Sequence, residues 1–174
     1  MTDQLERLRR KWARTDGCAL VVGSKVYGEK EDRRQLYPDA IGVDLLAGYG
    51  VDLVHNMESP LPLSIGQFSH VDCCSVLEHV RHPWLMAASI EAAMCDGATL
   101  LVSVPFAWRR HAYPSDYWRM TPEALEVLFP SIQWIRRGYV VNGRMRSIVP
   151  GANDGDLVYI ERAETVGIGC KLTS

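Results

Sequence analysis

A short glycine-containing turn and an acidic residue downstream of it could together bind a nucleoside. The turn reads GSKVYG at 23–28 and follows the apolar run CALVV at 18–22. Glycine here permits a tight turn and lets the backbone approach a ligand closely. Asp44 ends the next apolar run, where a carboxylate can accept hydrogen bonds from both hydroxyls of a ribose. Gly23 alone could be a plain turn residue and Asp44 a helix cap, but together they favour a nucleoside site.

Three kinds of nucleoside ligand can be compared at this turn. A P-loop needs Lys and Ser or Thr after its second glycine, whereas Gly28 is followed by Glu29 and Lys30. A carboxylate at that place would repel a phosphate. A dinucleotide fingerprint needs glycine where Lys25 stands, because a side chain obstructs the approach of the pyrophosphate. S-adenosylmethionine has no phosphate, and its carboxylate tolerates a nearby cation, so the turn favours this ligand.

Apolar runs must build the frame that holds this turn. Five short runs are predicted as strands, and the weakest of them, 51–54, is expected at an edge of the sheet. Two later runs look like strands that pair antiparallel across the loop 142–155. The five runs are 18–22, 40–44, 51–54, 70–76 and 99–104, and the later two are 132–141 and 156–163.

Two helices are predicted between the strands from their end signals. The segment 82–97 has Pro83 near its start and Gly97 just past its end. The segment 121–129 begins with Thr121 as N-cap, followed by proline at the first helical position. Helices at these places would connect or follow strands of a parallel sheet.

The N-terminal segment has the spacing of an amphipathic helix. Leu5, Leu8 and Trp12 share one stripe, and the basic residues around them are expected on a solvated face. The shortness of this helix and the exposed look of Trp12 suggest a homodimer. The basic residues expected in solvent are Arg7, Arg9, Arg10, Lys11 and Arg14.

This order of elements is typical of an α/β fold. We expect a Rossmann-like three-layer sandwich, with a mostly parallel sheet and an antiparallel C-terminal strand pair. The 174 residues are expected to form a single domain. Within it, 1–16 would hold the amphipathic helix, 18–129 the cofactor-binding core, and 130–174 the C-terminal strands and tail. In such sheets ligands bind beyond the carboxyl ends of the strands, where the glycine turn and Asp44 lie.

The composition limits which binding partners and which cellular compartment can be expected. With 19 basic and 21 acidic residues, the net charge of −2 gives no electrostatic case for nucleic acid as partner. No stretch of about 18 apolar residues predicts a membrane span, and the first residues lack the apolar centre of a signal peptide. The five cysteines show no C-x-x-C spacing. They fit small buried residues in a reducing cytoplasm, and we expect no metal site.

Three stretches resemble the class I S-adenosylmethionine-dependent methyltransferases, especially the small-molecule, methyltransferase-11-like branch. They read YPDAIGVDLLAGYGVDLVHNMESPLPL, FSHVDCCSVLEHVRHPWLMAASIEAAMCDGATLLVSVPF and PSDYWRMTPEALEVLF. The VLEHV segment, with a glycine and an apolar strand after it, is specific, and PSDYWRMT adds an independent match. The resemblance covers roughly 18–129. It implies S-adenosyl-L-methionine as cofactor and methyl transfer to a small molecule or sugar-like acceptor.

The resemblance also implies cofactor-binding residues. Gly23, with Ser24 and Lys25 beside it, would face the methionine part, and Asp44 would hold the ribose hydroxyls. Asn56 stands where the family often has an aspartate that bonds the adenine amino group, and its neutral amide can still accept a hydrogen bond. The other implied residues are Leu45 and Met57 at the adenine, and Ser75 and Val76 at the sulfonium.

On the acceptor side, the resemblance implies Glu78 and His79. His79 is the candidate catalytic base, because its ordinary pKa lies near the working pH and a hydroxyl acceptor must lose a proton during attack. The alternative is that His79 only caps the turn or bonds a backbone carbonyl. Asp116 and Arg119 could likewise form an internal ion pair. The segment after the fifth strand, where an acceptor lid would sit, holds the candidate substrate residues His111, Tyr113, Asp116 and Arg119.

Two departures from the family pattern keep a second function open. The family usually has an acidic residue where this chain has Val21, and a glycine where it has Lys25. The alternative to an enzyme is therefore a catalytically degenerate, methyltransferase-like binding or assembly module. Nucleic acid is disfavoured as acceptor, because SVLE at 75–78 stands where many nucleic-acid amino-methyltransferases carry [DNS]-P-P-[YFW].

Overall fold

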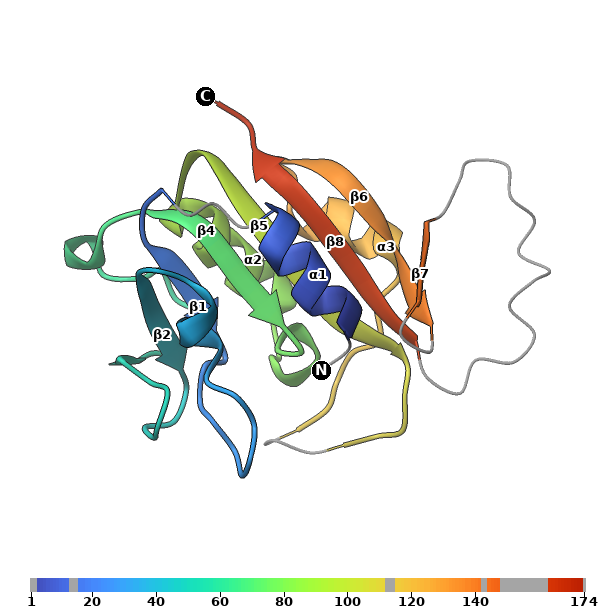
Figure 1. Cartoon of the computed structure of the whole chain (residues 1–174), viewed down its shortest axis with the longest axis horizontal. Helices are drawn as coiled ribbons and strands as arrows, with labels where there is room; N and C mark the ends of the chain where they lie inside the picture. Colours follow the sequence, from blue (N-terminus) through green and yellow to red (C-terminus); the bar gives the residue numbers. More distant parts are fainter. Residues whose placement is uncertain (1–2, 13–15, 112–114, 142–143, 148–162, 174) are drawn as a thin grey trace.

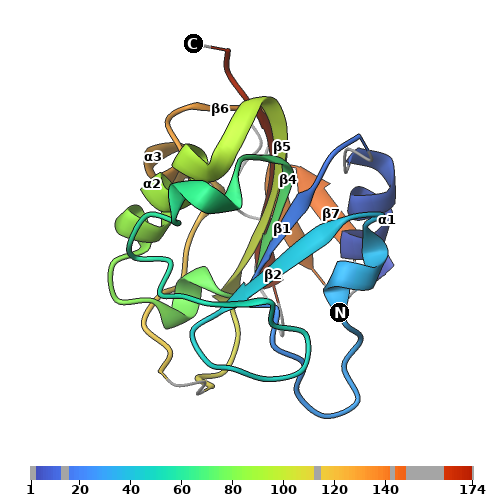
Figure 2. The same ribbon diagram turned by 90° about the vertical axis from the view of Figure 1, so that its left-hand side faces the viewer.

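A computed structural model of the chain describes residues 3–12, 16–111, 115–141, 144–147 and 163–173. Within them a single sheet runs through the middle, and helices cover both of its faces (Figure 1). Helix α1 (Asp3–Trp12) lies on one face, and α2 (Pro83–Ala93) and α3 (Pro122–Leu128) lie on the other, as Figure 2 shows. The predicted three-layer α/β sandwich is confirmed.

The strands of the sheet follow the order β3-β2-β1-β4-β5-β8-β6-β7. The parallel part consists of β1 (Ala19–Val22), β2 (Ala40–Asp44), β3 (Leu53–Val54), β4 (Phe68–Cys74) and β5 (Met94–Ala107). The antiparallel part consists of β6 (Ile132–Val141), β7 (Arg144–Ser147) and β8 (Ala163–Lys171). The chain leaves β1 toward β2 on one side and reaches β4 on the other, so the strand order reverses between β1 and β4. This is the place where parallel α/β sheets bind ligands.

The predicted C-terminal strand pair is present, but its second member lies later in the chain. Strand β6 spans the predicted residues 132–141. It has two antiparallel partners, β8, which begins at Ala163, and β7, which lies within the stretch 142–155 that was predicted as a loop. The strand predicted over 156–163 falls, except for that last residue, outside the described residues.

One helical expectation needs correction. Helix α2 ends at Ala93, four residues before Gly97, because Met94 is fully buried and already pairs with Phe68 of β4. Gly97, with φ of +71°, lies inside β5. In the crossover from β1 to β2, the glycine turn leads only to a short 3-10 helix, η1 (Arg33–Leu36), whose N-cap Asp32 accepts from Arg34 N. None of the helices in the described part is long and apolar enough to span a membrane.

The two faces of the sheet bury separate hydrophobic clusters, because successive side chains of a strand point to opposite faces. On the α2 side, Leu20, Val71 and Leu100 from β1, β4 and β5 pack in one cluster. On the α1 side, Leu5 and Leu8 pack in another. Trp12 packs partly buried against that second cluster, which removes the reason for expecting a homodimer at this residue.

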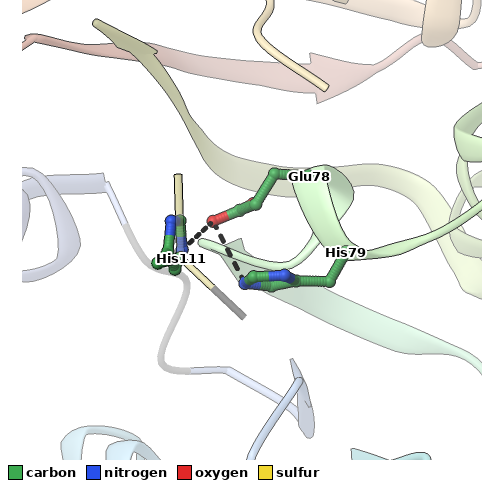
Figure 3. Close-up of side chains that lie close together, drawn as sticks. All are labelled: Glu78, His79 and His111. Atoms are coloured by element: carbon green, nitrogen blue, oxygen red, sulfur yellow. Dashed lines mark ion pairs between the residues drawn. The ribbon is translucent and has the colours of Figure 1, made fainter. Parts of the chain in front are cut away.

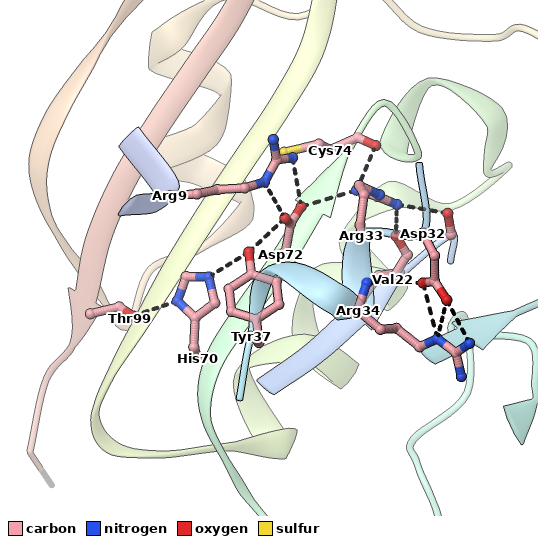
Figure 4. A network of polar contacts seen from close by, with 11 residues as sticks. Arg9, Val22, Asp32, Arg33, Arg34, Tyr37, His70, Asp72, Cys74 and Thr99 are labelled. Atoms are coloured by element: carbon pink, nitrogen blue, oxygen red, sulfur yellow. Dashed lines mark hydrogen bonds and ion pairs between the residues drawn. The ribbon is translucent and has the colours of Figure 1, made fainter. Parts of the chain in front are cut away.

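A buried charged network fastens α1 and η1 to the sheet (Figure 4). Fully buried Asp72 of β4 accepts from Arg9 Nε at 2.5 Å, from Arg33 Nη1 at 3.0 Å and from the Tyr37 hydroxyl at 2.7 Å. His70, on the same face of β4, contacts the Tyr37 hydroxyl at 3.3 Å. Burial raises the pKa of Asp72, but Arg33 and Arg9 outweigh it and hold this pKa well below its ordinary value. The carboxylate is therefore charged and paired.

The expectation that Arg9 lies in solvent is wrong. Its side chain is 3% exposed, because it points onto the sheet toward Asp72. Leu5, Leu8, Arg9 and Trp12 are spaced at i, i+3, i+4 and i+7, which places all four on one helix face. Its charge led to the prediction that Arg9 is exposed to solvent, although the spacing alone places it on the buried face of the helix.

Candidate functional site

The carboxyl ends of β1 and β2 are joined into one hydrogen-bonded unit. Gly23 N and Ser24 N donate to the Val43 carbonyl at 2.8 and 3.1 Å. The Asp44 side chain accepts from Lys25 N at 3.1 Å through Oδ2 and from Leu46 N at 3.1 Å through Oδ1. The glycine turn and the acidic residue, 21 residues apart in sequence, thus hold each other in place.

The Asp44 carboxylate can accept further hydrogen bonds besides these two from the backbone. Each of its oxygens accepts one backbone N–H, and a carboxylate offers about four lone-pair sites. Asp44 is half-buried. A carboxylate of this kind can accept two further hydrogen bonds from a diol.

Both the backbone conformation and the space available at position 23 require glycine. Its φ is +65°, in the left-handed region that favours glycine, and a Cβ there would lie 2.5 Å from Val76 Cγ2. The turn after β1 therefore lies against the segment that follows β4. This close approach brings Gly23 and Val76, both predicted site residues, together.

Ser75 is held in a strained backbone conformation at the end of β4. Its φ of +56° is positive, and among the described residues no other non-glycine shares this feature. Its N–H donates to the Ser103 carbonyl of β5 at 2.9 Å, and the residue is exposed. Such strain persists where the surroundings fix it, and it gathers at functional sites.

Of the three residues predicted at the adenine, two are exposed and one is buried. Leu45 is exposed beside Asp44, as an apolar contact for a ring requires. Asn56 is exposed, and its Oδ1 accepts from Glu58 N at 3.0 Å, which leaves its amide N–H groups to a ligand. Met57, in contrast, is 3% exposed and its side chain belongs to the hydrophobic core.

Lys25 carries its side chain along the loop that follows β2. A Cβ on Gly48 would lie 2.7 Å from Lys25 Cε, so the lysine chain passes directly over this glycine. Its Nζ lies 5.3 Å from the centre of the Tyr27 ring. The structure therefore accommodates a long side chain where the family pattern has glycine.

Arg33, which was not predicted as a site residue, ties the ends of β1 and β4 together. Its Nη2 donates to the carbonyls of Val22 and Gly23, both at 2.7 Å, and its Nη1 bonds Asp72 (Figure 4). Asp72 is the register partner of Val21 on the neighbouring strand. A buried carboxylate is thus present one strand away from the position where the family pattern has it. The sequence signal was an aspartate inside an apolar strand, which needs a counter-charge.

A second group of polar side chains follows β4. The 3-10 helix η3 (Leu77–His79) turns Glu78 and His79 toward His111, which lies after β5 (Figure 3). Glu78 Oε1 lies 3.7 Å from His79 Nε2 and 3.8 Å from His111 Nε2. The two imidazole rings meet edge to face, with centroids 4.9 Å apart.

His79 has one committed and one free nitrogen. Its Nδ1 lies 2.5 Å from the Ser115 carbonyl, which can only accept, so Nδ1 carries the proton and Nε2 the lone pair. Burial lowers the pKa of His79, which favours the neutral ring. The backbone bond considered as an alternative to a base role is present, yet it leaves Nε2 available as a base.

Glu78 is unusual because it is fully buried without a hydrogen-bond partner. Neither of its carboxylate oxygens has one, and the residue is 0% exposed. Burial raises the pKa of Glu78 to about 8. Buried polar groups are nearly always partnered, so this carboxyl group requires an explanation.

The segment after β5 is organised by an ion pair. Arg119 donates to both oxygens of Asp116, at 2.5 and 2.7 Å, so these two residues form the internal pair considered in the sequence analysis. Hydrogen bonds from Arg119 hold the pKa of Asp116 well below its ordinary value. Asp116 also accepts from His111 N at 2.8 Å. Tyr113 lies outside the described residues.

Comparisons with known proteins identify the fold. No protein-family model matches the chain, and no curated protein is detectably similar in sequence. The N-methyltransferase NodS of Bradyrhizobium japonicum, in complex with S-adenosylhomocysteine, matches with a TM-score of 0.61 over 97% of this chain and 84% of its own, at 10% identity. This is the class I S-adenosylmethionine-dependent methyltransferase fold.

Two further solved structures share this methyltransferase fold. A 1,6-didemethyltoxoflavin-N1-methyltransferase of Burkholderia thailandensis matches with a TM-score of 0.66 at 13% identity, over 98% of this chain and 77% of that one. A methyltransferase of Anabaena variabilis matches with a TM-score of 0.68 at 11% identity, over 95% and 82% of the two chains. The predicted fold is confirmed.

Proposed function

We propose that the chain is an S-adenosylmethionine-dependent methyltransferase that acts on a small molecule or sugar-like acceptor. The observation that carries the proposal is the placement of Asp44. In a methyltransferase fold, at the carboxyl edge of the sheet, its carboxylate is fixed by two backbone N–H groups and keeps lone pairs for a ribose diol.

The residues at this edge fit an adenosyl group. Gly23 presents backbone without a side chain, Leu45 offers an exposed apolar surface, and strained Ser75 lies at the end of β4. The two departures from the family pattern fit as well. Lys25 runs along its own loop, and a buried carboxylate is present beside Val21, on the next strand.

When bound, the cofactor would supply an electrophilic methyl group on its sulfonium. The chain must then orient the acceptor and accept its proton. His79 is suited to the second task, because the Ser115 carbonyl fixes its tautomer and burial favours its neutral form. Nε2 is then the atom that takes up the proton.

A reducing, cytoplasmic compartment belongs to the same proposal. All five cysteines are free, and two of them, Cys73 and Cys74, are buried in β4. Free thiols persist where disulfides are kept reduced. The alternative function is a non-catalytic binding or assembly module. Titration with S-adenosylhomocysteine distinguishes it from a methyltransferase.

Calorimetric titration with S-adenosylhomocysteine tests the cofactor part. We expect micromolar binding, about −8 kcal/mol, and at least a tenfold loss in Asp44→Ala. The matched control is Asp39→Ala, an exposed aspartate that precedes the other end of β2 and should leave affinity unchanged. A well-folded wild-type chain that binds no S-adenosylhomocysteine would favour the binding module.

A further inference from the structure

Three potential metal ligands converge near the end of β4. One oxygen of Glu78 and one nitrogen each of His79 and His111 all lie within 4.8 Å of one another. Around a tetrahedral ion with bonds of about 2.1 Å, ligand atoms lie about 3.4 Å apart. The two Glu78–histidine separations, 3.7 and 3.8 Å, exceed this by only a few tenths of an ångström. The third separation, between the two imidazole nitrogens, is at most 4.8 Å, so the rings would have to approach each other by up to about 1.4 Å to bind one ion.

Glu78 gives an independent reason to expect a cation. It is 0% exposed, both of its oxygens lack a hydrogen-bond partner, and Oε1 points between the two imidazoles (Figure 3). Burying a carboxyl group without partners is energetically costly. At 3.7 Å or more, neither histidine is close enough to act as hydrogen-bond donor or acceptor for it. A bound cation would satisfy the carboxylate.

Oxygen atoms lie near the outer ring nitrogens of both histidines, and His79 alone is placed to hydrogen-bond one of them. A ligating histidine usually presents its other ring nitrogen to a carbonyl or carboxylate oxygen. His79 Nδ1 lies 2.5 Å from the Ser115 carbonyl, and His111 Nδ1 lies 3.2 Å from Asp116 Oδ2, although not aligned as a hydrogen bond. In both rings it is Nε2 that faces Glu78.

We propose that Glu78, His79 and His111 form a binding site for one divalent transition-metal ion. Two imidazoles and one carboxylate favour ions such as Zn²⁺ or Fe²⁺ over Mg²⁺ and Ca²⁺, which prefer oxygen ligands. This departs from the sequence-based expectation of no metal site, which rested on cysteine spacing. His111 follows His79 by 32 residues, so no local motif connects them.

The proposed ion also narrows the acceptor, and this part rests on the proposed methyltransferase function. Three protein ligands leave a coordination position open. Glu78 lies three residues after Ser75, on the acceptor side of the proposed site. An acceptor hydroxyl could fill the open position, where the ion would lower its pKa. With the ion bound, His79 Nε2 is a ligand and not the base, so the lowered pKa would let the hydroxyl lose its proton to water instead. The site therefore favours an oxygen-bearing acceptor.

Zinc titration of the full chain, previously treated with a chelator, tests the site. We expect one equivalent of Zn²⁺ to bind in calorimetry, and at least a tenfold loss of affinity in Glu78→Gln and in His111→Ala. His55→Ala is the matched control, since His55 bonds the Ser59 carbonyl away from the cluster and should leave zinc affinity unchanged. Thermal denaturation of each variant verifies that it is folded.

Two outcomes would overturn the proposal. One is undiminished zinc binding in folded Glu78→Gln and His111→Ala, which would place the ion elsewhere, such as on the half-buried thiols of Cys18, Cys95 or Cys170. The other is Mg²⁺ binding as tight as Zn²⁺ binding. Titration with S-adenosylhomocysteine distinguishes a failure of the proposed metal site from a failure of the proposed methyltransferase function. Glu78→Gln should lose zinc and keep S-adenosylhomocysteine, and Asp44→Ala should do the reverse.

Discussion

Asp72 and Val21 are register partners on neighbouring parallel strands, with Asp72 at the centre of a network of two arginines and a tyrosine. The network joins three parts of the chain that are distant in sequence: α1 through Arg9, η1 through Arg33, and β4. Arg33 continues it to the carbonyls of the glycine turn. The buried charge therefore supports the edge of the sheet where the cofactor is proposed to bind.

Removing this charge should destabilise the protein strongly. Asp72→Asn removes the buried carboxylate that both Arg9 and Arg33 bind, and breaking a buried pair in this way costs about 3–5 kcal/mol. Urea denaturation measures the loss. Glu126→Gln, which removes an exposed ion pair with Arg137, should change the free energy of unfolding by less than about 1 kcal/mol. Equal effects of the two variants would contradict the role given to Asp72.

His70 should make stability depend on pH below neutrality. Burial lowers the pKa of His70 to about 4 from its ordinary 6.5. The unfolded chain takes up a proton at a higher pH than the folded protein, so stability falls as pH drops from about 6.5 toward 4. His70→Gln should reduce this slope, measured as the free energy of unfolding at several pH values. An unchanged slope would mean that His70 does not titrate as its burial predicts.

Glu78 should act in the opposite direction. Burial raises the pKa of Glu78 to about 8 from 4.5, so the metal-free folded protein keeps a proton that the unfolded chain has lost. Stability from this group therefore falls as pH rises from 4.5 to 8. With a chelator present, Glu78→Gln should raise the free energy of unfolding at pH 8 by more than about 1 kcal/mol, relative to its effect at pH 4.5. A variant whose effect does not change with pH would show that the carboxyl group is not protonated by burial.

Alanine substitutions at Gly23 and Gly28 distinguish the cost of a positive φ from the cost of a steric clash. Gly23 and Gly28 have nearly the same φ, +65° and +63°, but a Cβ meets Val76 at 2.5 Å only at Gly23, and nothing within 4 Å at Gly28. Gly28→Ala should therefore cost about 1 kcal/mol of stability and Gly23→Ala clearly more, with weaker S-adenosylhomocysteine binding in Gly23→Ala only. Chemical denaturation and calorimetry give the two readings. Similar losses at both positions would refute the close approach of Gly23 and Val76.

The parts of the fold that were predictable are those fixed by local pattern. Buried parallel strands need continuous apolar runs, so β1, β2 and the core of β4 could be located, and with them the edge where Asp44 lies. The end of α2 was misplaced, because Met94 is drawn into the sheet by pairing with Phe68, a tertiary contact.

The parts that were missed depend on contacts between distant segments. Arg9 reads as a surface residue until Asp72 is placed beside it. Glu78 and His79 could be named from their motif, but their surroundings could not. The Tyr117 N–H donates to the Glu78 carbonyl at 2.7 Å, and the Ser115 carbonyl accepts from His79, so the segment after β5 is what completes this group.

A crystal structure of the chain with S-adenosylhomocysteine would test the central claim most directly. We expect both ribose hydroxyls within hydrogen-bonding distance of the Asp44 carboxylate, and the sulfur near Ser75, on the side from which His79 Nε2 can be reached. A ligand bound elsewhere, or the Asp44 carboxylate turned away from the ribose, would contradict the proposed cofactor site.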